Sequence, residues 1–379
     1  MLKVANQRYE CLQCGKCCRC FRIALTALEI EAIAKLDWPH PPPRYYELFQ
    51  GRSVLKHKDG GDCVFLDEQS RCRMHALFGA HCKPLSCKAY PFEFLATFGD
   101  EVTVMARFDC PAVLAGRGAR LTAHRQTLEY VLADRQLHLG TGFSAAQLQG
   151  LQRGAVECIR DFLLLDISQS ASSFPALLTL TRRMEKLGPN FLNDLPTLRL
   201  VLPSMRSKAQ YEHTREPRTR WSWPERIQAR AALIEYLRRD EALSNTALWT
   251  RLGQAFSGIR LFAGGGNAAD FHQGEHPDFP LRKARLFDEA YWNGASPDPS
   301  ADRPWRRFLS ARLETLQFFG AANHGATFFA GLCALLQTSV TAQLLARLRA
   351  AAEQRRTLSA ADWGYATAAI DHCFGRRQR

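Results

Sequence analysis

CLQCGKCC, residues 11–18, places four cysteines within eight residues. Cys11, Cys14 and Cys17 are each separated by two residues, and Cys18 follows directly. In a C-x-x-C turn, one backbone loop can supply two thiolate ligands and point its amide N–H groups at the sulfurs. The stretch therefore predicts a metal-binding loop, around which the N-terminal part of the chain folds.

The remaining cysteines are concentrated in the same part of the sequence. The chain has 379 residues and 13 cysteines, ten of which lie between Cys11 and Cys110. A packing role would scatter them through the core. The sequence starts without an apolar leader, so we expect a reducing cytoplasm, where dense cysteines bind metal more often than they form disulfides.

Eight thiols make up the expected ligand set, and their number allows two four-thiolate sites or one cluster plus a zinc ion. The spacing does not decide whether Cys17 or Cys18 is the ligand, and His75 is an alternative ligand close to Cys72. The set consists of Cys11, Cys14, Cys17, Cys18, Cys63, Cys72, Cys87 and Cys110.

The spacing favours an iron–sulfur cluster, of the 4Fe–4S type, over zinc. Ferredoxin-type runs combine C-x2-C-x2-C with a remote Cys-Pro, and here Cys110 is followed by Pro111. A zinc ribbon would require two separated C-x2-C pairs, and the sequence holds only the first. The C-x3-C-x2-C spacing of radical chemistry on S-adenosylmethionine is absent from the sequence.

Periodicity predicts an α+β fold in two parts. Residues 1–120 form a small cysteine-rich metal-binding module, with a capped helix over 25–36 and a β-hairpin over 92–106 that returns Cys110 toward Cys87. Residues 121–379 form a mainly α-helical domain, because apolar residues recur there at helical spacing with Arg and Glu between them. A stretch around 264–304, rich in Gly, Pro, Asp and His, reads as a long loop.

The motifs resemble the CxxCxxCC family of zinc- or iron-chelating proteins, which includes flagellin lysine N-methylases. The resemblance is carried by CLQCGKCC, CVFLDEQSRCRMH, KPLSCKAYPF and FDCPAV, and it covers residues 9–115. It implies that the eight cysteines above bind the metal, with Cys20 and Cys82 as extra thiols. It also implies methyl transfer from S-adenosylmethionine to a lysine of flagellin or of another protein substrate. No catalytic residue or S-adenosylmethionine pocket can be named from the sequence.

The net charge of +13 favours anionic partners at low salt. Basic residues are interleaved with glutamates, as over 206–239, so a solvated face is the expected role and nucleic-acid binding is not predicted. No stretch approaches the eighteen or so apolar residues that cross a bilayer, and no membrane span is expected.

Overall fold

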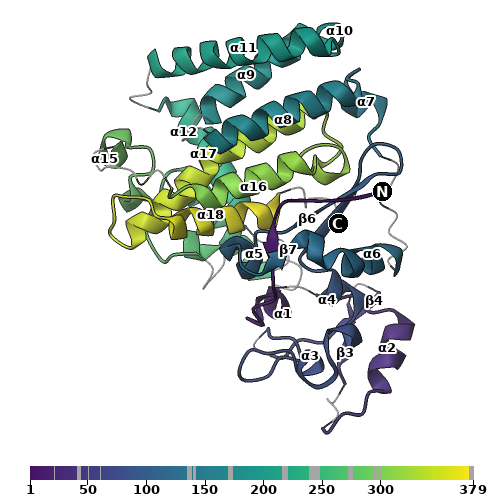
Figure 1. Cartoon of the computed structure of the whole chain (residues 1–379). Helices are drawn as coiled ribbons and strands as arrows, with labels where there is room; N and C mark the ends of the chain where they lie inside the picture. The colour runs from purple at the N-terminus through teal and green to yellow at the C-terminus, as the bar shows by residue number, and fades with distance from the viewer. Residues whose placement is uncertain are drawn as a thin grey trace.

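The computed structural model describes residues 1–374 except for 21, 41–43, 50, 60, 135–138, 140, 141, 170–173, 216–220, 239–247, 272–275, 294–297 and 299. The cysteine-rich elements, purple to blue in Figure 1, gather below a larger set of helices coloured teal to yellow.

The widest sheet of the described residues joins the N-terminus to the predicted hairpin. Strands β5 (Phe92–Ala96) and β6 (Val102–Ala106) pair antiparallel, and β1 (Leu2–Val4) lies parallel to β6 on its other side. Gly99, in the turn, has φ of +57°, a left-handed conformation that glycine adopts without a Cβ clash. The hairpin expected from the alternating pattern is therefore confirmed.

Two short strand pairs complete the β structure of the described part of the chain. Strand β2 (Arg8–Tyr9) is antiparallel to β7 (Ala119–Arg120), and β3 (Tyr46–Phe49) is antiparallel to β4 (Arg52–Leu55). The β2–β7 pair matters most for the site, because it holds the entry to the cysteine loop beside the segment that follows Cys110.

Short helices connect these strands. The capped helix predicted from the sequence is α2, where Thr26 caps the backbone of Glu29 and the Glu29 carboxylate accepts a hydrogen bond from the Thr26 N–H. The short helices of this part are α1 (Lys16–Cys20), α2 (Ala27–Ala34), α3 (Arg73–Phe78), η1 (Ala80–Cys82), α4 (Leu85–Ala89), α5 (Pro111–Ala115) and η2 (Leu121–His124).

The rest of the chain is helical. Long helices such as α9 and α17 agree with the helical periodicity of the second part of the sequence. The elements are α6 (Arg125–Asp134), α7 (Ala145–Leu148), α8 (Arg153–Gln169), α9 (Phe174–Leu187), α10 (Pro189–Leu192), α11 (Leu195–Arg215), α12 (Trp223–Leu237), α14 (Leu248–Phe262), η3 (Ala268–Asp270), η4 (Leu281–Ala284), α15 (Glu289–Asn293), α16 (Arg303–Glu314), η5 (Ala321–Asn323), α17 (Phe328–Ala352) and α18 (Ala360–Cys373).

Buried apolar side chains of the described residues fall into two separate cores. The larger core spans the helices and also takes in the β1–β6–β5 sheet and Cys110. The small core lies among the cysteine-rich elements and consists of Leu25, Ile33, Leu55, Cys63, Phe65 and Met74. Burying so few side chains stabilises a fold only weakly, so these elements need a further source of stability.

Helix α17 corrects the expectation about apolar stretches. It is long and apolar enough to cross a membrane by length and composition. However, 67% of its most apolar window is buried inside the protein, where Arg347 of the helix forms an ion pair with Glu289 at 2.7 Å. The helix is thus placed as a core helix. The α+β fold class is confirmed, and the boundary between 1–120 and 121–379 stays a prediction.

Candidate metal centre

Backbone and side-chain contacts attach the cysteine loop to the segment that carries Cys63 and Cys72. The Cys63 N–H donates to the Cys18 carbonyl at 2.9 Å. Arg19 donates to the Asp62 carboxylate at 2.9 Å and to the Ser70 hydroxyl at 2.6 Å. Cys18 also packs against the small core that contains Cys63.

Gly15 allows this close approach. Its φ is +69°, and a Cβ at this position would lie 2.8 Å from the Ser70 carbonyl oxygen. Any other residue would therefore combine a left-handed backbone with a clash against the neighbouring loop.

The N-terminal strands bring the first cysteines toward Cys110. The side chain of Gln7 donates to the Ala106 carbonyl and accepts from the Ala106 N–H, both at 2.8 Å, and β2 then pairs with β7. Cys11 follows directly after this anchored segment, while Cys110 follows β6 and precedes α5. The sheet thus brings together two cysteines that are far apart in the sequence.

Two adjoining cavities collect all eight predicted cysteines. The first, named the loop cavity, has a volume of about 760 Å³ and is lined by Cys11, Cys14, Cys17, Cys18, Cys72, Cys87 and Cys110. The second, named the interface cavity, has a volume of about 610 Å³ and is lined by Cys17, Cys18, Cys63, Cys72 and Cys87. Cys87 and Cys110 face the same loop cavity, as the hairpin predicted.

The two extra cysteines of the N-terminal part differ from this set. Cys82 lines neither cavity, and its thiol donates to the Phe78 carbonyl at 3.3 Å. The side chain of Cys20 lies outside the described residues. His75, the alternative ligand, lines the loop cavity.

The sulfurs of Cys17 and Cys18 are 4.0 Å apart. Across the described residues, no three Cys, His, Asp or Glu side chains stand together closely enough to enclose a metal ion as they are. The chemistry of the donors and their shared cavities therefore decide whether a metal fits.

The raised pKa values of the buried thiols indicate that the two cavities hold too little positive charge to stabilise several thiolates. The hydrogen bond from Cys18 lowers the pKa of Cys17 to about 6, so this cysteine is the preferred thiolate. Burial raises the pKa of Cys63 and of Cys110 to about 11, and burial also raises the pKa of Cys87. At neutral pH most of these buried thiols hold their protons, because ionising several of them together in a low-dielectric site is unfavourable.

A soft cation fits this donor set. Thiolates are the preferred ligands of zinc and of iron–sulfur clusters, and the cation supplies the charge that lets neighbouring thiols ionise. Metal uptake then releases protons, so affinity for the metal falls as pH falls.

Lys83 is a residue of the site that the sequence did not reveal. Burial opposes its charge, but the nearby Cys87, Cys72 and Cys17 raise the pKa of Lys83 overall. Its ammonium group borders both cavities and offers positive charge to the thiolates. Apart from its place four residues before Cys87, nothing in the sequence distinguishes it from the other lysines.

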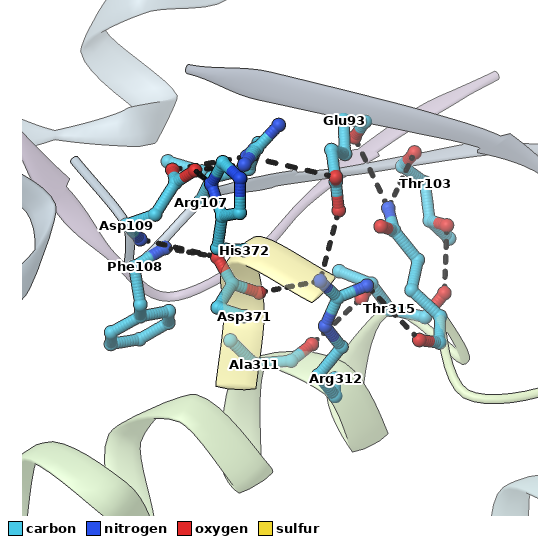
Figure 2. Close-up of polar contacts among 12 residues, drawn as sticks. Glu93, Thr103, Arg107, Phe108, Asp109, Ala311, Arg312, Thr315, Asp371 and His372 are labelled. Carbon is cyan, nitrogen blue, oxygen red and sulfur yellow. Dashed lines mark hydrogen bonds and ion pairs between the residues drawn. The ribbon is translucent and has the colours of Figure 1, made fainter. Parts of the chain in front are cut away.

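A buried ionic network forms the opposite wall of the interface cavity, which Glu93, Arg107 and Arg312 also line. Figure 2 shows Arg312 of α16 directed at Asp371 of α18, with N···O at 2.5 Å, and at Glu93 of β5, at 3.1 Å. Asp371 is fully buried and also accepts the Phe108 N–H at 2.6 Å.

The same network continues to Asp109 (Figure 2). Arg107 forms an ion pair with Asp109, and His372 lies 3.1 Å from the same carboxylate. Burial opposes ionisation of this carboxyl, yet Arg107 and His372 lower the pKa of Asp109 to about 2. These ion pairs hold the hairpin against α16 and α18. No periodicity in the sequence predicts the network.

Comparisons with known proteins match the part of the chain that carries the thiols. Residues 10–110 match the family model CxxCxxCC, described as "Putative zinc- or iron-chelating domain". An uncharacterized protein of Methanocaldococcus jannaschii is 28% identical over 86 residues, which cover 22% of this chain and 44% of that protein. The match thus spans less than half of the relative's length. No solved structure matches the chain.

Proposed function

Because residues 10–110 match the CxxCxxCC family model, whose description names zinc or iron chelation, we propose that this part of the chain binds a metal through the eight predicted cysteines. The observation that carries the proposal is the convergence of those eight, and not of Cys82, on two adjoining cavities. The ligands are Cys11, Cys14, Cys17, Cys18, Cys63, Cys72, Cys87 and Cys110.

The eight thiols divide into two groups of four. Cys63 lines the interface cavity and not the loop cavity, and Cys72 and Cys87 line the interface cavity with it. Cys18, whose carbonyl accepts the Cys63 N–H, belongs with that side. The first proposed group is Cys18, Cys63, Cys72 and Cys87, and the second is Cys11, Cys14, Cys17 and Cys110.

The second group has the ferredoxin-type spacing, and we assign a 4Fe–4S cluster to it. Cys11, Cys14 and Cys110 line the loop cavity only, and Cys17 completes the C-x2-C-x2-C run. The first group has no such spacing, and its four thiols suit a tetrahedral zinc ion. The opening stretch thus supplies ligands to both sites, which accounts for its adjacent cysteines.

Elemental analysis of protein purified without oxygen tests the metal assignment. We expect about four iron and four sulfide ions per chain, a brown colour and about one zinc ion. Stoichiometric zinc without colour would overturn the cluster but keep the thiolate sites. Protein with neither metal would overturn both.

We also propose that the protein acts in the cytoplasm as a flagellin lysine N-methylase-like methyltransferase. The support is the resemblance of the cysteine motifs, together with the interface cavity. Its volume of about 610 Å³ is in the range of small-molecule sites, and its walls hold both thiols and the ionic network. In the reaction, the methyl group leaves the sulfonium of S-adenosylmethionine and joins a lysine ε-amine, with loss of one proton.

Binding of S-adenosylmethionine separates this activity from a non-enzymatic role, in which the metal module is a structural or redox-sensing clip. We expect saturable binding and transfer of a labelled methyl group to flagellin lysines. Ala322→Trp, which adds an indole to the lining of the interface cavity, should abolish both, whereas Ala145→Trp on the exposed start of α7 should not. Full metal content without any binding of S-adenosylmethionine would select the clip.

A further inference from the structure

A third cavity, named the basic cavity, lies where β2, β7, α5, α16 and α18 meet, and its volume is about 1100 Å³. Its lining contains no Asp or Glu from the described part of the chain. It does contain six cationic side chains, which come from segments distant in sequence: Arg8, Lys16, Arg120, Arg303, Arg307 and Arg349. The basic residues behind the +13 net charge are dispersed along the sequence, but six of them gather at this cavity.

Two elements place like charges side by side at this cavity. Arg8 of β2 is directly opposite Arg120 of β7 in the strand register. Arg303 and Arg307 are four residues apart on α16, and so share one face of that helix. Like charges in either arrangement are destabilising in the absence of a compensating anion.

Most of the arginines that line the basic cavity have no carboxylate partner among the described residues. Within the described residues, Arg8, Arg120, Arg303 and Arg307 form no ion pair with Asp or Glu. Arg349 differs, because it pairs with Glu353 at 3.4 Å. Four guanidinium groups thus share one concave surface without internal neutralisation.

Arg307 is held in place for contact with the cavity. It donates to the carbonyls of Leu114 at 3.0 Å and of Val113 at 2.8 Å. Gly116 makes room for it, since a Cβ there would lie 2.7 Å from the guanidinium nitrogens. Burial and the charge of Arg303 lower the pKa of Arg307, which indicates that its charge is poorly compensated.

The rest of the lining is suited to a compact ligand. Small residues of α18, such as Gly364 and Ala368, leave space beside Tyr365, whose hydroxyl is hydrogen-bonded to His276 at 2.8 Å. A volume of about 1100 Å³ accommodates a molecule of nucleotide size. The cations converge on a cavity and do not extend as a stripe over the surface, which favours a small polyanion over a nucleic-acid strand.

We propose that the basic cavity binds a small molecule carrying a chain of two or more phosphoryl groups. The chain can belong to a nucleoside di- or triphosphate or to free inorganic polyphosphate. Phosphoryl oxygens are the acceptors that arginine guanidinium groups recognise in bidentate fashion. The described lining of the basic cavity includes no cysteine, and Lys16 is the single one of its six cationic side chains that comes from the cysteine loop.

Isothermal titration calorimetry of the full chain at low salt with ATP and with inorganic tripolyphosphate tests the proposal. We expect both to bind, with affinity falling as salt is raised. Equal affinities would identify the phosphate chain alone as the ligand, and tighter binding of ATP would identify a nucleotide. Either result supports the proposal.

The matched variants are Arg120→Gln with Arg303→Gln, against Arg199→Gln on the exposed surface of α11. The double variant should bind at least tenfold more weakly, while the control binds as wild type. Both altered arginines are exposed and unpaired, so the double variant should melt no lower than wild type without ligand. Absent binding, unchanged affinity in the double variant, or tighter binding of a single-stranded oligonucleotide than of ATP would overturn the proposal.

Discussion

Cys87→Ser is expected to unfold the cysteine-rich elements while the large helical core stays folded. The small core around Phe65 and Met74 buries few side chains, so we expect metal binding to supply much of its folding free energy. Loss of one thiolate from a four-thiolate site should lower the free energy of unfolding of this part by more than about 4 kcal/mol. Hydrogen exchange resolved along the sequence would show the loss of protection in α2, α3 and α4.

Cys82→Ser is the matched control, because it makes the same change five residues away, outside both thiol cavities. We expect it to cost about 1 kcal/mol or less, the strength of a hydrogen bond such as the one to Phe78. Equal protection in the two variants would remove Cys87 from the ligand set.

Asp371→Asn should destabilise the helical part by about 3–5 kcal/mol, because it leaves the buried charge of Arg312 without its closest partner. The asparagine oxygen can still accept the Phe108 N–H, but its NH2 group then faces the Arg312 guanidinium, so the change removes both the charge and the hydrogen bond from Arg312. Urea unfolding measures the effect, and Glu129→Gln in the exposed pair with Arg125 is the control, with an expected cost of about 0.5 kcal/mol.

Adding Arg312→Met to Asp371→Asn distinguishes an unpaired charge from lost packing. The double variant should be more stable than Asp371→Asn alone, because no isolated charge remains in the core. A double variant that is less stable than the single variant would show that Arg312 contributes mainly through packing and its contact with Glu93.

Local signals predicted the local structure. The Thr26–Glu29 capping box and the Gly99 turn both lie within a few residues of the elements they define, and both appear as expected. The spacing of Cys11, Cys14 and Cys17 predicted one loop, and all three line the loop cavity.

Features that depend on distant residues could not be predicted in the same way. The hydrogen bond from the Cys63 N–H to the Cys18 carbonyl joins segments that the sequence does not relate. The Arg312–Asp371 pair and the facing Arg8 and Arg120 also arise only when strands and helices pack together. Because glutamates are interleaved with the arginines in the sequence, the arginines were expected to lie on a solvated face. Several arginines instead line one cavity.

Native mass spectrometry of three proteins prepared without oxygen tests the central claim most directly: wild type, Cys87→Ser and Cys82→Ser. The account predicts that wild type and Cys82→Ser carry the same mass of bound metal. Cys87→Ser should lack the mass of the metal that one of the two sites binds. The same bound mass in all three proteins, or a wild-type mass equal to that of the bare chain, would contradict it.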